Sequence, residues 1–454
     1  MLPRSVTKLA FSGLLTAALL SSVAAHARTR PHYGGTLRVE TVGDAWQLPD
    51  GLARRLTLDT LTTINESGQA EPALATRWES ENADHRWEFQ IRPGVRFHDG
   101  SPLTADTVVA ALDLTCQPPA ATCLWRTLHA VGPSIILTTD SPTPDLPELL
   151  AQTKFAISQQ DAASPTDGTG PFRVTGFANG ALTLVANDDS WQGRPFLDSI
   201  EIYPHRSIRD QWLDLSVGRA DVVEVPPEML RQAEQQHLAV LVSRPVDLLS
   251  LAVTPQGPLA SLQMRQSIAL AVDRASISNV IFQKQGEVTA SLLPAALSGY
   301  SFLFPANLDL DRARTLRGGA STAPLTLATE DTSAAMQLAA ERIALNLHEA
   351  GFTVLATPGA HPPAPLVLRR DHLEAASPRA ALDELLARFG QNGTVTGTDP
   401  AALYQSEQAA LVNGAIVPLL WLPREWAAGE RVRDLRLSPD GIPLLAGASL
   451  EGAP

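Results

Sequence analysis

The segment that decides the fold is EPALATRWESENADHRWEFQIRPGVRFHDGSPLTADTVVAALDL, which spans residues 71–114. Polar and apolar side chains alternate over residues 86–91, and this period of two predicts a strand with one buried face. Pro93-Gly94 predicts a turn, because proline presets φ and glycine accepts a positive φ. The alternation resumes at residues 95–97, so we expect a β-hairpin whose second strand contains them.

A helix is expected after this hairpin. Thr104 is placed to cap its N-terminus, and Asp106 lies in the first turn, where a negative charge is favourable. Val108 and Leu112 lie on one face of this helix. Nothing in the unit forms a nucleophilic centre or a metal cage by itself. The pattern therefore predicts a structural hairpin and helix, not an active site.

The order of these residues resembles the signature of the family 5 solute-binding proteins of ABC importers, the peptide- and nickel-binding group. Members of that family carry a proline-led Leu-Ala-x-x-Trp-Glu, an aromatic strand, Arg-Pro-Gly-Val-x-Phe-His-Asp-Gly and Leu-Thr-Ala-Asp-x-Val. This chain has these motifs, in the same order and without gaps, at Pro72–Glu79, Trp87–Phe89, Arg92–Gly100 and Leu103–Val108. A match over roughly forty residues is far more specific than a short motif.

Further segments carry the same resemblance, which covers about Tyr33 to Leu444. They are the glycine-led opening at 33–39, the Gly-Thr-Gly-Pro-Phe at 168–172, the helical 264–274, the strand at 416–421 and the turn at 437–441. The glycines at 168 and 170 suit a tight crossing of the chain. They do not form a phosphate loop, because no Gly-Lys-[Ser/Thr] follows.

The resemblance implies an α/β protein with a two-lobed periplasmic binding protein type II fold and an extra small domain (class C). We expect the chain to divide into a signal peptide and five structural segments. These are 1–27 signal peptide, 28–62 first part of lobe I, 63–166 small extra domain, 167–248 second part of lobe I, 249–415 lobe II, and 416–454 return to lobe I.

The length and the composition of the chain are those expected of a soluble protein with more than one domain. The chain has 454 residues, which is more than one ordinary domain, so two or three hydrophobic cores are expected. Hydrophobic residues make up 44% and charged residues 18%, as in soluble globular proteins. The formal net charge of −13 argues against nucleic acid and anionic membranes as general partners.

The N-terminus has the features of an export signal. Arg4 and Lys8 precede an apolar run over residues 9–25, and Ala25-His26-Ala27 provides a small-x-small cleavage site. The alternative is a membrane anchor, but polar residues interrupt this short run. No cysteine follows the run, so a lipid anchor is not expected. We therefore expect cleavage after about Ala27 and a free, monomeric periplasmic protein.

Two cysteines occur, Cys116 and Cys123, just after the expected helix. In an oxidising compartment this spacing permits a small disulfide loop. Two buried free thiols are the alternative. A metal site is not expected there, because no histidine pair lies nearby at ligand spacing.

Asp44 and Trp46 are the first candidates for ligand contact. They follow the expected strand at 36–42, and in open α/β folds the loops after the carboxyl ends of strands line the ligand crevice. The alternative is that both residues are ordinary loop anchors. Trp421, in the strand that is expected to cross back to lobe I, either lines the cleft or packs at the hinge.

The segment after Pro365 departs from the family pattern. Family members have a strand followed by a tryptophan, an acid and an Asp-Pro, and in peptide binders an acidic group nearby holds the amino terminus of the ligand. Here the strand leads into Arg369, Arg370 and Asp371. Either arginine is able to clamp a carboxylate in bidentate fashion, and Asp371 is the positional counterpart of the family's acid. The alternative is a solvated charged turn.

The strongest helical pattern of the chain lies at 334–350. Its apolar residues form one stripe, Gly351 is placed to end it, and strands are expected on both sides. This βαβ unit predicts parallel strands in lobe II. A second helix is expected over residues 264–274, with Asp273 and Arg274 acting as a local salt link or cap.

The resemblance implies binding rather than catalysis, with no cofactor and no metal. The expected function is capture of a small, peptide-like solute and its delivery to an ABC permease in the inner membrane. A hydrolase is disfavoured because Gly-x-Ser-x-Gly and His-Glu-x-x-His are absent and the histidines are scattered. A degenerate paralogue that senses a ligand or binds a protein partner is the second alternative. The sequence leaves open whether the ligand is a peptide, a nickel chelate, a sugar or an opine.

Overall fold

The computed structural model describes residues 32–46, 51–116, 123–159, 167–236, 238–299, 304, 306–319, 323–330, 333–359, 364–391, 395 and 397–452. The expected signal peptide at 1–27 lies outside these residues. No helix within the described ranges combines the length and the apolar character that crossing a bilayer requires.

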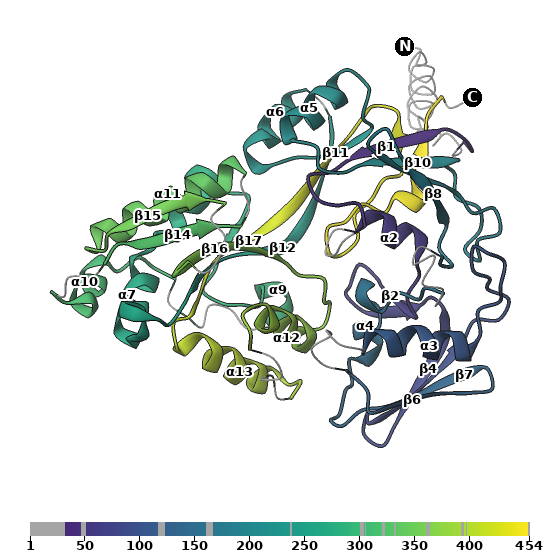
Figure 1. The fold of residues 1–454 in the computed structure, drawn as a ribbon, viewed down its shortest axis with the longest axis horizontal. Coiled ribbons are helices and arrows are strands. Elements are labelled where there is room, and N and C mark those ends of the chain that lie inside the picture. The colour runs from purple at the N-terminus through teal and green to yellow at the C-terminus, as the bar shows by residue number, and fades with distance from the viewer. Residues whose placement is uncertain are drawn as a thin grey trace, which may run out of the picture.

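One mixed sheet connects the two halves of the molecule (Figure 1). Its strand order is β15-β14-β16-β12-β17-β11-β1-β10-β9-β8, and β13 pairs with β17. The strands are β1 (Thr36–Glu40), β8 (Phe172–Ala178), β9 (Ala181–Ala186), β10 (Ser199–Tyr203), β11 (Val222–Glu224), β12 (Ala239–Val253), β13 (Glu287–Val288), β14 (Leu325–Thr329), β15 (Val354–Pro358), β16 (Leu366–His372) and β17 (Ile416–Ala428). We call the half with β1 and β8–β11 lobe I and the half with β14–β16 lobe II.

The long strands β12 and β17 run through both lobes and join them. They pair antiparallel along most of their length, but the register shifts around Pro245, which lies opposite Pro423. Proline has no backbone N–H to donate, so neither residue donates a ladder hydrogen bond at this position. A bulge of this kind bends a strand locally. The connection between the lobes therefore has an irregular register at a pair of prolines.

Lobe I packs its core between the sheet and the helix that follows β1. Strand β1 runs parallel to β10 and β11, and Leu37 and Val39 are fully buried in the core beside α2 (Leu52–Thr57). A smaller apolar cluster on β11 and β17 packs with α5 (Ile208–Ser216) and α6 (Leu230–Gln235). Alternating burial on these strands follows from the two-residue period of the side chains.

Lobe II contains the expected βαβ unit. Helix α11 (Ala334–Glu349) follows β14, Gly351 has a φ of 94°, and β15 runs parallel to β14. The parallel pairing that the sequence predicts is therefore confirmed. The same core includes residues from α7 (Leu262–Ala271) and α10 (Leu310–Arg317). Residues from α12 (Pro378–Arg388) and α13 (Pro400–Val412) pack in the core cluster that also contains Trp421.

The prediction of a single helix over residues 264–274 is wrong at the C-terminal end. Helix α7 stops at Ala271, and Val272 has an extended backbone. Asp273 then accepts a hydrogen bond from the backbone N–H of Ser276 and caps α8 (Arg274–Ser276). Because the Asp273 side chain satisfies backbone donors of a new turn, it ends one helix and begins another. Its expected role as a cap is confirmed.

The small domain has a four-stranded antiparallel sheet of order β4-β5-β7-β6. Its elements are β4 (Ala75–Glu81), β5 (Arg86–Ile91), β6 (Thr127–Val131), β7 (Ser134–Thr138), α3 (Ala105–Thr115), α4 (Leu146–Leu149) and the 3₁₀ turn η1 (Thr153–Phe155). The Thr104 hydroxyl accepts a hydrogen bond from the backbone N–H of Thr107 and caps α3, with Asp106 in the first turn, as expected. Val108 and Leu112 are fully buried in the core.

The hairpin expected over residues 86–97 is wrong. Strand β5 is real, but its partners are β4 and β7. Val95 and Phe97 are buried without belonging to a strand; the backbone there makes only an isolated bridge between Arg96 and Pro102. Both side chains reach the core from an irregular segment. Alternation by itself does not identify the strand that supplies the hydrogen-bonding partners.

The remaining elements are short. They are β2 (Thr62–Ile64) paired with β3 (Ala70–Pro72), β18 (Val432–Arg433) paired with β19 (Ser449–Leu450), α9 (Ala295–Ser298), η2 (Pro227–Met229), η3 (Gly257–Ala260), η4 (Ile277–Ile281) and η5 (Leu445–Gly447).

The crossing at residues 168–170 is as tight as the sequence predicts. A Cβ atom on Gly168 would lie 2.2 Å from the backbone oxygen of Thr57, and one on Gly170 would lie 2.5 Å from that of Leu56. The Gly170 N–H donates to Thr57 O at 2.9 Å. Since any side chain would meet backbone atoms, glycine is needed for the chain to pass the end of α2 at this distance.

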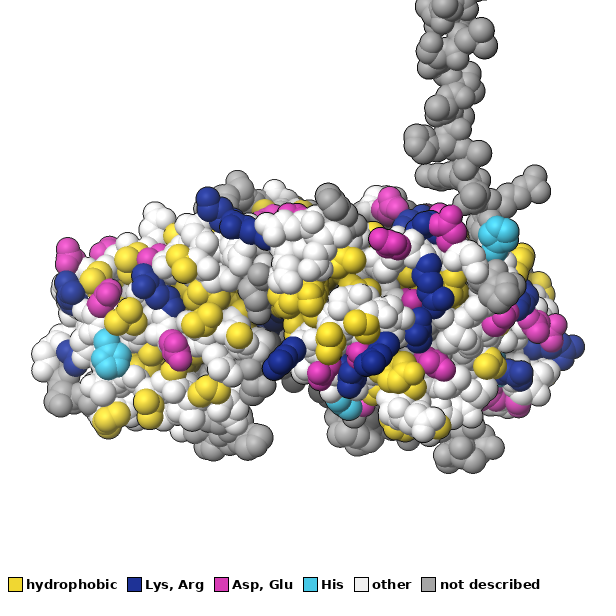
Figure 2. All heavy atoms as spheres, turned by 90° about the horizontal axis from the view of Figure 1, so that it is seen from above, with side chains coloured by type: hydrophobic (Ala, Val, Ile, Leu, Met, Phe, Trp, Pro, Cys, Tyr) yellow, Lys and Arg dark blue, Asp and Glu magenta, His cyan; other side chains and the backbone are white. Residues whose placement is uncertain are grey.

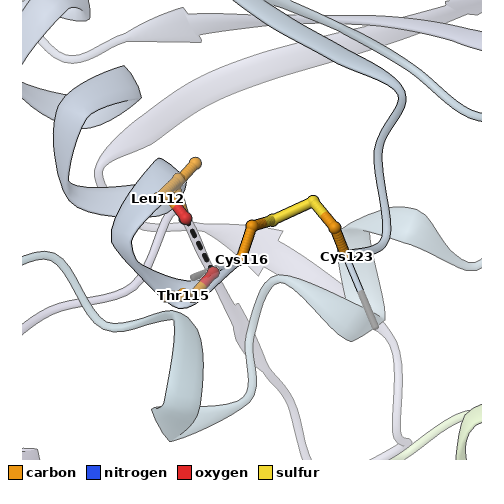
Figure 3. Close-up of a disulfide and its surroundings, with 4 residues drawn as sticks. All are labelled: Leu112, Thr115, Cys116 and Cys123. Carbon is orange, nitrogen blue, oxygen red and sulfur yellow. Dashed lines mark hydrogen bonds between the residues drawn. A yellow bond between two sulfur atoms is a disulfide. The ribbon is translucent and has the colours of Figure 1, made fainter. Parts of the chain in front are cut away.

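The sulfur atoms of Cys116 and Cys123 are bonded, which links the end of α3 to the segment that leads to β6 (Figure 3). Residues 117–122 lie outside the described part of the chain. The Thr115 hydroxyl donates to Leu112 O at 2.7 Å in the last turn of α3.

Candidate functional site

A cavity of about 480 Å³ lies where the two lobes and the small domain meet. Seen from above, the two lobes lie side by side with an indentation between them (Figure 2). Apolar side chains from α2 and from residues 442–446 line much of the cavity. The ionisable residues in its lining are Arg55, Asp59, Arg244, Glu374 and Asp440.

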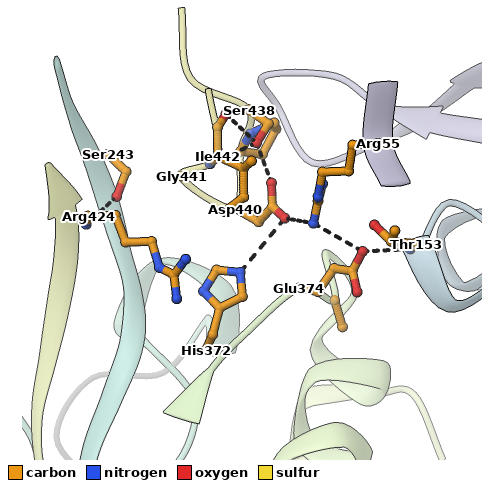
Figure 4. Close-up of polar contacts among 12 residues, drawn as sticks. Arg55, Thr153, Ser243, His372, Glu374, Arg424, Ser438, Asp440, Gly441 and Ile442 are labelled. Atoms are coloured by element: carbon orange, nitrogen blue, oxygen red, sulfur yellow. Dashed lines mark hydrogen bonds and ion pairs between the residues drawn. The ribbon is translucent and has the colours of Figure 1, made fainter. Parts of the chain in front are cut away.

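Arg55 connects lobe I to lobe II at this cavity (Figure 4). Its Nη2 lies 2.5 Å from Asp440 Oδ2, in the C-terminal segment, and 3.2 Å from Glu374 Oε1, directly after β16. Glu374 Oε1 also accepts a hydrogen bond from the Thr153 backbone N–H at 2.5 Å. One carboxylate therefore joins lobe II to lobe I and to the small domain.

The charges in this group stabilise one another. Burial alone would disfavour the charged forms, but Arg55, His372 and Ser438 outweigh it and hold the pKa of the Asp440 carboxyl well below its usual range. Burial also opposes the charge on Arg55, but Asp440 and Glu374 raise its pKa. The pairing thus keeps both groups ionised, as expected for a buried ion pair with hydrogen bonds.

Asp247 is the centre of a second charged group, on β12 near the proline bulge. Its side chain is 2% exposed and accepts hydrogen bonds from Arg370 Nε at 2.8 Å, Arg424 Nε at 3.0 Å and His372 Nδ1 at 2.8 Å. Burial would raise the pKa of this carboxyl, but Arg424, Arg370 and His372 hold it well below its usual value. Three strands, β12, β16 and β17, are therefore tied together by one carboxylate.

His372 joins the two charged groups. Its Nδ1 faces Asp247, and its Nε2 forms an ion pair with Asp440 Oδ2 at 3.8 Å (Figure 4). Burial and the charge of Arg424 lower its pKa, whereas the hydrogen bond to Asp247 and the nearby carboxylate of Asp440 raise it, and the net direction is upward. A buried imidazole between two carboxylates is stabilised in its protonated form.

Arg369 and Arg370 are adjacent in the sequence, but their side chains lie on opposite faces of β16. Arg369 and Asp371 share one face of β16, where Arg369 Nη2 lies 3.0 Å from Asp371 Oδ1 and its guanidinium lies over the Phe389 ring. Arg370 is on the opposite face, with Asp247, because neighbouring strand residues alternate. None of the three is among the described residues that line the 480 Å³ cavity.

Asp44 and Trp46 lie at the end of β1, as the sequence predicts, and they contact each other. The Trp46 N–H donates to Asp44 Oδ1 at 2.7 Å, and Asp44 Oδ2 lies 3.7 Å from His205 Nε2. The Trp46 side chain packs against the lobe I core. Neither residue is among those described as lining the cavity.

Trp421 lies on β17 and is 1% exposed. Among the described residues its indole nitrogen has no hydrogen-bond partner. It lines a second cavity of about 540 Å³ in lobe II, together with Thr289, Ser291, Phe304 and Asn307. Trp426, by contrast, donates to Gly441 O at 3.1 Å and packs in the lobe I core.

The residues that sequence reasoning missed are Arg55, Asp247, His372, Glu374, Arg424 and Asp440. Glu374 follows a recognisable strand, but its partner Arg55 is 319 positions away. Asp247 and Arg424 lie within β12 and β17. A charged residue close to a proline in a long apolar strand was the sequence signal that could have identified each of them. Within the described ranges no group of three or more His, Cys, Asp or Glu side chains is arranged to hold a metal ion.

Comparison with known proteins identifies the fold and the family. The model of the bacterial extracellular solute-binding proteins, family 5 Middle, matches residues 69–363. The structure is similar to the oligopeptide-binding protein AppA from Bacillus subtilis in complex with a nonapeptide, with a TM-score of 0.82, 17% identity and coverage of 93% of this chain and 100% of AppA. It is also similar to NikA from Staphylococcus aureus in complex with Ni(L-His)2, with a TM-score of 0.77, 17% identity, and coverage of 92% and 100%.

Curated relatives match only part of the chain. The uncharacterized protein YhjP of Bacillus subtilis is 29% identical over 222 residues, which is 47% of this chain and 36% of YhjP. The HTH-type transcriptional regulator SgrR of Escherichia coli (strain K12) is 28% identical over 186 residues, which is 39% of this chain and 34% of SgrR. The chain thus spans about a third of the length of these relatives.

Proposed function

Because the chain belongs to the bacterial extracellular solute-binding proteins of family 5, we propose that it captures a peptide-like small solute between its lobes and delivers it to an ABC permease in the inner membrane. The chemistry is binding, without bond breaking and without a cofactor. The protein acts as a monomer in the periplasm after removal of a signal peptide at residues 1–27. We propose that the lobes and the small domain divide at the residues expected from the sequence.

The 480 Å³ cavity is the observation that carries this proposal. Its lining comes from lobe I, from the small domain and, through Glu374 and Ala376, from lobe II. A volume of this order suits a small organic ligand. A solute in the cavity contacts both lobes, so its binding free energy favours the arrangement in which they are closed. This is the property that a transport-type binding protein needs.

A thermal-shift screen of the purified mature protein tests the proposal. The panel contains di- and oligopeptides, metal chelates, sugars and opines. A ligand that binds only the folded state raises the apparent Tm by mass action. A saturable shift with one peptide class supports the proposal; no shift across the panel contradicts it.

The ligand contacts of Asp44, Trp46, Arg369, Arg370, Asp371 and Trp421 stay predictions. For Arg370 the structure gives a specific route, because its guanidinium orients Asp247 at the junction of β12 and β16. We expect Arg370→Ala to weaken binding of the ligand found in the screen by about tenfold while the far-UV circular dichroism is retained. Unchanged affinity in titration calorimetry would show that Arg370 has no role in binding.

A ligand sensor is the second candidate function. The match to the transcriptional regulator SgrR favours it, because part of that regulator is similar to part of this chain. The two functions differ in a cellular measurement. Deletion of the gene abolishes uptake of the radiolabelled ligand if the protein feeds a permease. Uptake is retained, and a ligand-dependent change in gene expression is lost, if the protein is a sensor.

A further inference from the structure

Glu374, the acidic residue on the lobe II side of the cavity, already has partners within the protein. Glu374 Oε1 accepts a hydrogen bond from Arg55 Nη2 at 3.2 Å and from the Thr153 N–H at 2.5 Å. The Arg55 side chain is 23% exposed and that of Glu374 is 14% exposed, so water screens this pair only partly. The charge of Glu374 is therefore largely compensated before any solute enters.

Arg55 is held in this position from two sides. Asp440 Oδ2 binds the same Nη2 atom at 2.5 Å, and Asp440 is itself held by Ser438 and His372. The Asp440 carboxylate thus holds Arg55 in position independently of Glu374. In the structure this lobe I cation contacts the lobe II carboxylate.

The other ionisable groups of the cavity lining have partners of their own, and Arg54, which donates to Thr153 O at 3.3 Å, also acts on Glu374 with its charge. Asp59 accepts hydrogen bonds from Trp191 Nε1 at 2.8 Å, from Thr169 Oγ1 at 2.8 Å and from Gln192 Nε2 at 3.3 Å, and burial raises its pKa. Arg244 is exposed and donates to Pro439 O at 2.7 Å.

We propose that Arg55 is a resident cation that takes the place of a cationic ligand group at Glu374, so that the site selects a solute whose end at Glu374 is uncharged. This inference rests on the proposed function of the same cavity. A ligand ammonium at Glu374 would meet the guanidinium of Arg55 as a like charge, which disfavours it. An uncharged amide or acyl end has no such penalty.

The test compares two probes that differ by one charge, trialanine amide and N-acetyl-trialanine amide. At about pH 6.5 the α-amino group, with an ordinary pKa of about 7.7–8.0, is protonated. Titration calorimetry measures both affinities for the wild-type protein and for Arg55→Gln. We expect trialanine amide to bind at least about tenfold more tightly to Arg55→Gln than to the wild type, because the carboxylate of Glu374 then no longer pairs with Arg55.

Two further variants identify the cause of such a gain. Adding Glu374→Gln to Arg55→Gln removes the freed charge and is expected to reverse the gain. Arg86→Gln removes a cation from an ion pair with Glu81 in the small domain and is expected to leave the ratio of the two affinities unchanged. Circular dichroism shows whether each variant is folded.

Each outcome decides the inference. A gain for the amine probe that depends on Glu374 supports it. Tight binding of trialanine amide to the wild type, no gain in folded Arg55→Gln, or a gain that persists in the double variant overturns it. If Arg55→Gln does not fold, the single variant Glu374→Gln decides. The inference is supported if the ratio of the affinities for the two probes is the same in Glu374→Gln as in the wild type. It is overturned if Glu374→Gln loses affinity for trialanine amide but not for N-acetyl-trialanine amide. The proposed function fails separately, when the wild type binds nothing in the broad screen.

Discussion

The substitution Asp247→Asn tests how strongly the charged group at the lobe junction stabilises the fold. Asp247 is the shared acceptor of Arg370, His372 and Arg424. The asparagine side chain is nearly isosteric, so the change removes the negative charge and leaves the packing. The variant keeps two guanidinium groups and an imidazole around a neutral amide in a region where the original carboxylate is 2% exposed.

The expected cost is about 3 kcal/mol of the free energy of unfolding. Removing one partner of a buried ion pair costs about 3–5 kcal/mol, since the remaining charge is left unpaired. The lower end applies here, because the side chains of Arg370 and Arg424 are 26% and 17% exposed and can be hydrated after the change.

Urea unfolding at pH 7, followed by tryptophan fluorescence, measures this cost. The matched control is Asp188→Asn, which removes an exposed carboxylate, 76% accessible, that pairs with Arg194. We expect the control to change the free energy of unfolding by less than about 1 kcal/mol. A loss in Asp247→Asn no larger than in the control would refute the view that this group holds the three strands together. The pKa of Asp247 is depressed in the fold, so its contribution to the free energy of unfolding is present above the unfolded pKa of about 3.9 and is lost as pH falls below it. The difference in stability between Asp247→Asn and the wild type should therefore become smaller at acid pH.

Three further outcomes are expected. The pKa of His372 is raised in the fold, so its contribution to the free energy of unfolding is complete below about pH 6.5 and is lost as pH rises through the folded pKa. In His372→Gln the free energy of unfolding should no longer depend on pH in this way. A pH dependence parallel to that of the wild type would contradict the role of His372. Gly170→Ala should cost at least about 1–3 kcal/mol in urea unfolding because its Cβ meets backbone atoms of α2, whereas Gly447→Ala, with open space around the new atom, should be near neutral. Reduction of the Cys116–Cys123 bond should lower the free energy of unfolding by roughly 2–3 kcal/mol for so short a loop, measured with and without dithiothreitol, and the same reductant should not affect the double serine variant.

Local pattern was sufficient for much of the fold. The periodic stripe of α11, the cap at Thr104 and the close-packed glycines at 168 and 170 were all predictable, because each depends on neighbouring residues or on backbone geometry. The parallel pairing of β14 and β15 also followed, since a helix connects them. The family resemblance, which rested on ordered motifs, led to the correct fold.

Two local predictions were wrong for the same reason. The expected hairpin at 86–97 required a strand partner, and β5 takes β4 and β7 instead. The expected helix at 264–274 ended early, because Asp273 bonds to the backbone of the following turn. In both places a local pattern was compatible with two structures, and hydrogen-bond partners selected one of them.

The candidate site was decided by tertiary structure. The sequence showed the adjacent Arg369 and Arg370, but only the pleat of β16 places them on opposite faces and gives Arg370 to Asp247, 123 positions away. Arg55, Glu374 and Asp440 come from three distant segments and are brought together only by the tertiary fold. Periodicity, caps and turns act between residues close in sequence, whereas charge compensation depends on distance in space, and the folded chain alone determines that distance.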